Sequence, residues 1–121
     1  MIAYQYVVLR CVPRVDREEF VNVGVVLYSQ AADFLGCASH LDEPRLLALA
    51  PELDLAPLRS ALDAVAGACR GDGPAGAAGL GPRFGWLAAP RSTIIQPGPV
   101  HGGLAEDPEV ELSRLLDMLV R

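Results

Sequence analysis

Arginines and small hydroxyl side chains are the residues of this chain best suited to bind an anion. The planar fork of an arginine makes bidentate hydrogen bonds to phosphate or carboxylate, and hydroxyls add donors. Acidic residues of the loop that follows the first predicted strand could instead neutralise the arginines in a lattice of ion pairs. We keep both interpretations open. The predicted ligand-binding residues are Arg10, Arg17, Asn22, Arg91, Ser92 and Thr93, with Arg14 beside them.

His101 is the single best candidate for a general acid or base. It lies in a glycine- and proline-rich stretch, residues 97–103, just before the acidic pair Glu106-Asp107. The pKa of an imidazole is ordinarily near neutrality, which suits proton transfer. No serine or cysteine stands at a local spacing that would tie it to His101, so a histidine that fixes the geometry of a loop is the alternative.

Recognised catalytic and metal-binding motifs are missing. Without a lysine the chain has no phosphate-binding loop of the G-x-x-x-x-G-K-[ST] type, and its one G-x-G-x-x-G match, residues 71–76, follows a predicted helix rather than a strand. Cys37-x-x-His40 with Asp42 is the nearest approach to a metal pattern, but a tetrahedral site needs further ligands. We expect no metal and no cofactor, and the absence of these motifs favours a protein that is not an enzyme.

Charge and composition limit the classes of partner that we expect for this chain. The 121 residues include ten arginines, no lysine and fifteen acidic residues, for a formal net charge of −5. Nucleic-acid binding depends on clustered positive charge, so we expect none. No apolar run approaches the ~20 residues that a membrane-spanning helix needs. The three cysteines are far apart and no signal peptide precedes the first strand, which indicates the cytoplasm.

The elements that must position these side chains follow from periodicity. Residues 3–12 and 19–29 predict a β-hairpin, and residues 34–39 and 92–96 predict further strands. Asp42, Asp54 and Asp107 are predicted N-caps of three helices. Residues 71–82 are rich in glycine and proline and predict a flexible surface loop. The expected fold is α+β: a single domain, residues 1–121, with an antiparallel sheet of about four strands and two or three helices packed mainly on one face.

The two faces of the second predicted strand differ in polarity. Val21, Val23, Val25 and Leu27 alternate toward the core, whereas Asn22 and Gly24 lie on the other, mixed face. A glycine inside a strand often marks a bulge or a close approach of another backbone. The mixed face and the preceding loop form the predicted interaction surface, with residues Arg14, Arg17, Glu19 and Asn22.

The chain also resembles a known family. The matching stretches are YVVLR (residues 6–10), REEFVNVGVVL (17–27), APRSTIIQP (89–97) and PVHGGLAEDP (99–108). They resemble the bacterial domain-of-unknown-function 3037 family, with EFVNVGV the most specific part. Gly102 stands where the resemblance leads us to expect threonine.

The resemblance implies kinship without an activity. It also implies a partner, because members of that family are often encoded beside a protein resembling the HipA-type serine/threonine kinases. Our leading hypothesis is therefore a non-enzymatic interaction or regulatory domain, with a HipA-like kinase as its candidate partner. The alternatives are an anion-binding protein for a nucleotide or a phosphorylated ligand, with phosphoester chemistry at His101 if it turns its ligand over, and a homodimer formed through exposed strand edges.

Overall fold

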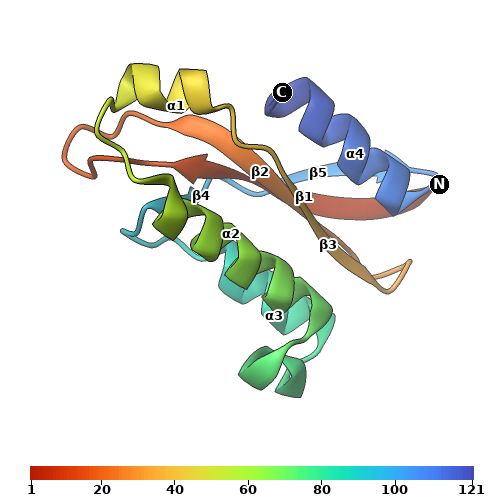
Figure 1. The fold of residues 1–121 in the computed structure, drawn as a ribbon. Helices are drawn as coiled ribbons and strands as arrows, with labels where there is room; N and C mark the ends of the chain where they lie inside the picture. The colour runs from red at the N-terminus through yellow and green to blue at the C-terminus, as the bar shows by residue number, and fades with distance from the viewer.

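A five-stranded antiparallel sheet organises the chain, and the computed structural model describes all residues, 1–121 (Figure 1). Strand β1 (Ile2–Cys11) lies at its centre. On one side β1 pairs with β2 (Val21–Ser29), which pairs with β3 (Phe34–Ser39). On the other side β5 (His101–Ala105) pairs with the first half of β1 and β4 (Ile95–Pro97) with its second half. The α+β class and the antiparallel sheet are confirmed.

Strand β5 corrects the sequence prediction of a glycine-rich loop around His101. His101 is the first residue of β5 and is paired with Tyr6. The two glycines of β5 have low strand propensity, which concealed the strand. Strand β1 has ten residues and β4 only three, so β4 cannot pair with the first half of β1. The backbone N–H and C=O groups of that half pair with β5 instead.

A bulge in β2 changes which residues share a face. Leu9 pairs with Gly24 and Arg10 with Asn22, so Val23 is an extra residue between the two pairs. The alternation therefore shifts, and Val23 packs into the same core as Val26 rather than with Val25, as strict alternation predicted. Gly24 also meets a neighbouring backbone, because a Cβ there would lie 3.0 Å from the carbonyl oxygen of Ala38. The structural interpretation of Gly24 is thus confirmed.

Three of the four α-helices begin at a capping aspartate that the sequence predicts. Asp42, Asp54 and Asp107 cap α1 (Glu43–Leu49), α2 (Leu55–Arg70) and α4 (Pro108–Leu119), each accepting a backbone N–H of the first turn. Gly71 ends α2 in the left-handed conformation, with φ of 82°. The three predicted caps are confirmed.

Helices pack on both faces of the sheet, whereas the sequence led us to expect them mainly on one. Helix α2 and helix α3 (Leu80–Ala88) bury one face, and α4 packs on β2 and β3 from the opposite side (Figure 1). Two separate apolar clusters result, one around Val7, Leu9 and Leu58 and the other around Leu27 and Leu115. Because β2 contributes to both clusters, its mixed face is covered rather than free for a partner.

Residues 71–82, which the sequence predicts as a flexible surface loop, include some regular structure. They contain a 3-10 helix η1 (Gly73–Ala77) and the first turn of α3. Arg83 holds the segment against α2, because its guanidinium donates to the carbonyl oxygens of Ala68 and Cys69. A contact between residues 14 or 15 positions apart is not visible in local composition. None of the helices has the length and apolar character needed to cross a membrane.

Candidate functional site

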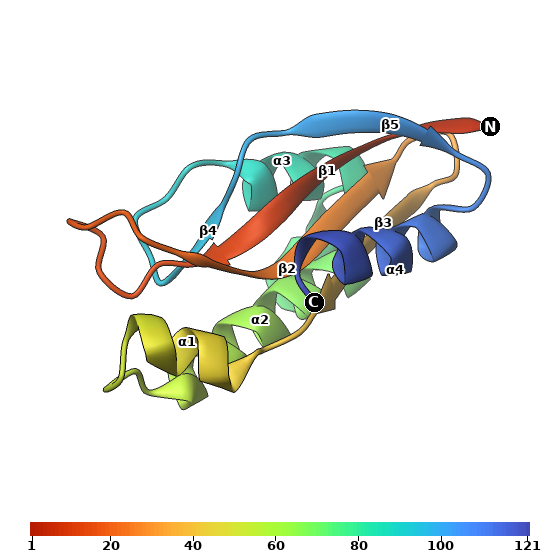
Figure 2. The same cartoon turned by 90° about the horizontal axis from the view of Figure 1, so that it is seen from above.

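One part of the sheet surface is not covered by a helix. Seen from above, α4 lies over β2 and β3 (Figure 2), and it also buries Tyr4 of β1 and Ala105 of β5, whereas the rest of β1, β4 and the start of β5 have no helix over them. We call this part the open sheet face. Tyr6, Val8 and Arg10 of β1 lie on it half-buried, Gln96 of β4 is paired with Arg10, and exposed His101 of β5 is paired with Tyr6.

Arg10 is the most unusual side chain of the open sheet face. Its guanidinium lies 4.2 Å from the centre of the Phe20 ring, and Nη2 lies 3.1 Å from the position that a Cβ of Gly98 would take. The Nε atom is buried and has no hydrogen-bond partner. A guanidinium carries five N–H donors, and no group of the protein accepts a hydrogen bond from any of those of Arg10.

The other nine arginines all have acceptors. Five form exposed ion pairs, which include Arg14 with Asp16 at 2.6 Å and Arg17 with Glu19. Arg114 pairs with buried Glu111, and the remaining three donate to backbone carbonyl oxygens. Arg14 and Arg17 lower the pKa of Asp16 and Glu19, respectively, by hydrogen bonds to their carboxylates. The ion-pair lattice that the sequence left open is therefore present in residues 14–19, and Arg10 lies outside it.

The remaining predicted anion ligands do not converge on Arg10. Arg91 lies at the C-terminal end of α3, where its guanidinium donates to the carbonyl oxygen of Trp86. The guanidinium also lies 4.9 Å from the centre of the Trp86 ring. The Thr93 hydroxyl donates to the carbonyl oxygen of Ile95 at 2.6 Å, and Ser92 is exposed. Asn22 is paired with Arg10 across β1 and β2, but its amide donates to the carbonyl oxygen of Leu119 at 3.2 Å.

His101 has an aromatic environment rather than a catalytic one. Its ring stacks on Tyr6, with 5.1 Å between the ring centres and 29° between the planes. It makes no side-chain hydrogen bond or ion pair to another residue of the chain. A general acid or base is normally oriented by such a partner. The arrangement suits stacking more than proton transfer.

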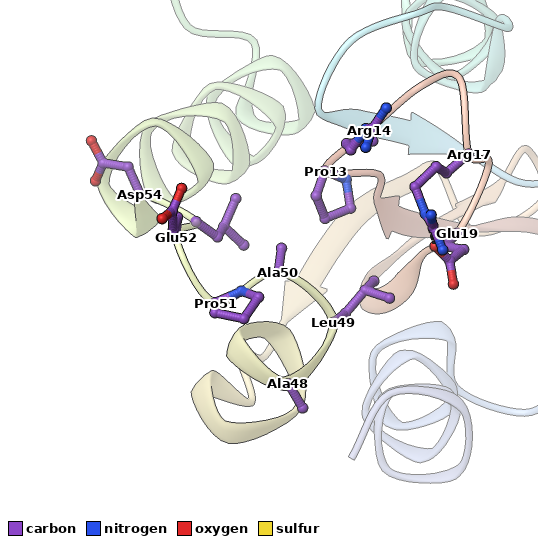
Figure 3. A pocket seen from close by; sticks show the side chains of 11 residues that line it. Pro13, Arg14, Arg17, Glu19, Ala48, Leu49, Ala50, Pro51, Glu52 and Asp54 are labelled. Carbon is purple, nitrogen blue, oxygen red and sulfur yellow. Dashed lines mark hydrogen bonds and ion pairs between the residues drawn. The ribbon is translucent and has the colours of Figure 1, made fainter.

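A groove brings together three of the four predicted interaction residues. Arg14, Arg17 and Glu19, from the loop between β1 and β2, face the connection between α1 and α2 across a cavity of about 820 Å³ (Figure 3). Glu52 and Asp54 line the opposite side. Asn22, the fourth predicted residue, is not part of this groove. Two arginines already paired with carboxylates, facing further acids, make the groove a poor site for an anion.

A comparison with protein-family models establishes the family of this chain. A model described as a protein of unknown function, DUF3037, matches residues 6–120. The chain belongs to the DUF3037 family. No curated protein and no solved structure matches it.

In this DUF3037 protein, three residues near Arg10 were not predicted from the sequence as part of a site. Phe20 and Gln96 lie within the stretches that carry the family resemblance, but neither was predicted as a site residue. The sequence placed Gly98 only in the glycine- and proline-rich stretch of residues 97–103. The signal for Gly98 was its place between two prolines, where the absence of a side chain leaves room for the guanidinium of Arg10.

The cysteines of this DUF3037 protein do not form a site. All three are free, and Cys37 lies half-buried in β3. Burial raises the pKa of Cys11 and Cys69 to about 11 and that of Cys37 to about 12, which keeps the thiols protonated. No three histidine, cysteine or acidic side chains come together in a way that could hold a metal ion.

Proposed function

We propose that this protein is a non-enzymatic binding domain that recognises a phosphate or carboxylate group with Arg10. The single observation that carries the proposal is that Arg10, alone among ten arginines, has no acceptor in the protein. Buried donors without partners are rare, and each calls for a physical explanation. The Nη groups of Arg10, which unlike Nε are not buried, are open to an oxyanion, and two of its oxygens can accept from them together.

The surroundings of Arg10 support the proposal. Phe20 packs against the guanidinium, and a cation over an aromatic face is stabilised without using any of its hydrogen-bond donors. No carboxylate makes an ion pair with Arg10, so a ligand does not compete with an internal partner. The absence of an oriented base beside His101 favours binding over turnover. A cytoplasmic location is part of the proposal, supported by three cysteines that form no disulfide.

Titration with inorganic phosphate tests this function. The 12.8 kDa chain suits ¹H–¹⁵N NMR, and sodium phosphate would be added against sodium chloride at constant ionic strength, because exposed charges respond to salt alone. Shifts localised to the amides of Arg10, Phe20 and Gly98 are expected at millimolar phosphate. Hydrogen bonds to charged groups contribute about 1.5–3 kcal/mol, so Arg10→Met should weaken binding roughly tenfold or more.

Arg14→Met is the matched control, because it removes the same charge from an arginine that already has a carboxylate partner. It should leave phosphate binding unchanged. Arg10→Lys keeps the charge but loses the fork, so it should recover only part of the affinity. Shifts spread evenly over the surface, or persisting in Arg10→Met, would refute the function.

The groove of Figure 3 supports a second candidate function, docking of a protein partner. We propose the HipA-like kinase implied by the family resemblance as that partner. Charge reversal on one side of the groove, Arg17→Glu, should weaken capture of the kinase in a pulldown. Arg59→Glu alters an exposed ion-paired arginine that does not line the groove and is the control. Equal capture by both variants would exclude the groove as the docking site.

A further inference from the structure

We propose that the open sheet face binds a nucleoside monophosphate, with its phosphate on Arg10 and its base stacked on His101. The inference rests on the anion-binding function proposed above and adds the class of ligand. It uses a second feature of the same face, a row of aromatic rings that the anion site alone does not explain.

The aromatic row runs along β1 from Tyr4 to Tyr6 and then crosses to His101 on the edge strand β5. Tyr4 is buried under α4, Tyr6 lies 6.1 Å from it between ring centres, and His101 lies 5.1 Å beyond Tyr6. His101 is the outermost ring and is exposed. Because it rests on Tyr6 it is already held in place, so a base that stacks on it needs to order no further protein side chain. Every nucleobase has a π-face that can stack on such a ring.

The distance between the two features suits one nucleotide. The amide of Gly98 donates to the carbonyl oxygen of Val8 at 2.8 Å, so Gly98 lies level with Val8. The guanidinium of Arg10 lies against Gly98 and therefore at the same level. Tyr6, with His101 beside it, is two residues further along β1, which is about 7 Å in a strand. A single ribose separates base from phosphate over a gap of this order.

The floor between the two ends is compatible with a ribose. Val8, which is level with the guanidinium, is the next residue of β1 after Tyr6 on this face, and its side chain is half-buried. Its carbonyl oxygen is already engaged by Gly98. A sugar can therefore lie over an apolar surface without leaving buried polar groups of the sheet unpaired.

The charge of the chain favours a free nucleotide over a nucleic acid. Tight binding of a polymer requires several cations along a track of phosphates. Here one arginine is without an acceptor, and the formal net charge is −5. One unpaired guanidinium matches one phosphate group.

Calorimetric titrations with three probes test the proposal: adenosine 5′-monophosphate, adenosine and inorganic phosphate. The monophosphate should bind at least fivefold more tightly than either fragment, because stacking of a base adds a factor of roughly five to a hundred. Equal affinities for the monophosphate and inorganic phosphate would overturn the nucleotide inference and leave the anion-binding function standing. If neither the monophosphate nor inorganic phosphate binds, the nucleotide inference and the anion-binding function are both overturned.

Variants at His101 separate stacking from other contributions. His101→Ala should lower the affinity for the monophosphate at least fivefold and leave that for inorganic phosphate unchanged. His101→Phe keeps a flat ring and should retain the affinity for the monophosphate. His101 is exposed, so neither change disturbs a packed core. Full affinity in His101→Ala, or equal loss in both variants, would refute stacking on this ring.

Discussion

Replacement of Glu111 by glutamine should destabilise the protein in a manner that depends on pH. Glu111 is on α4, and its side chain is only 11% exposed. It accepts hydrogen bonds from Arg114 at 2.6 and 2.9 Å and from the hydroxyl of Tyr4 on β1. These bonds, that of Arg114 above all, lower the pKa of Glu111 from 4.5 to about 2. Burial first, then the bond to Glu111, raises the pKa of Tyr4 to about 12.

The pKa of Glu111 sets the size and the sign of the effect. One pKa unit corresponds to about 1.36 kcal/mol, so a difference of roughly 2.5 in the pKa of Glu111 corresponds to about 3 kcal/mol. Arg114 is more than half exposed, so water screens its contribution and we expect about 1–2 kcal/mol. A carboxyl whose pKa is lowered on folding stabilises the protein fully above its unfolded pKa near 4.5. This stabilisation is lost as the pH falls from there toward 2.

Urea denaturation at a series of pH values measures this effect. At pH 7 the free energy of unfolding of Glu111→Gln should be about 1–2 kcal/mol below that of the wild type, and the difference should shrink between pH 5 and pH 2.5. Asp117→Asn removes an exposed carboxylate from the same helix, one that pairs with Arg121, and should change stability little. A Glu111→Gln variant as stable as the wild type at pH 7, or a difference that does not vary with pH, would refute this account of α4 docking.

Three further predictions follow from packing, burial and the free sheet edge. Gly103→Ala should cost about 1–3 kcal/mol in urea denaturation, because its Cβ would lie 2.6 Å from the ring of Tyr4; Gly102→Ala, with 3.7 Å to the nearest atom, should be much milder, and equal losses would contradict the prediction. The three buried or half-buried thiols should react with a thiol reagent far more slowly in the native protein than in urea, and fast native labelling would show that burial does not protect them. We also propose that β5, which pairs only with β1 and carries exposed Leu104, forms a homodimer edge to edge; sedimentation should show a dimer that Leu104→Arg converts to monomer, whereas a monomeric wild type would exclude it.

Local signals account for most of the fold that the sequence predicted. Each helix cap is a short-range event, since Asp42, Asp54 and Asp107 accept N–H groups two or three residues away. Strand β3 likewise begins and ends where alternation and turn residues placed it, at Phe34–Ser39. Such features need no knowledge of the tertiary fold.

Features that depend on distant partners were not predictable. Strand β5 exists because β1 leaves backbone groups unpaired about 100 residues earlier in the chain. The bulge at Val23 depends on the register between two strands, and it moves the valine to the other face. Composition describes neither event.

The arginine cluster illustrates the same limit at the level of the site. Sequence reasoning grouped Arg10, Arg17 and Arg91 by residue type, but the structure gives each a different environment. Arg17 finds an acid two residues away, and Arg91 finds the carbonyl oxygens at the end of α3. Arg10 extends instead from a central strand onto an open surface. Only the tertiary structure distinguishes the arginine that lacks an acceptor from those that have one.

Recognition of an oxyanion by Arg10 is tested most directly by an NMR titration of the wild type and of Arg10→Met with inorganic phosphate at constant ionic strength. Saturable shifts centred on Arg10, Phe20 and Gly98 are expected in the wild type, and they should disappear in Arg10→Met and persist in Arg14→Met. Absence of localised shifts in the wild type, or their survival in Arg10→Met, would contradict such recognition by Arg10.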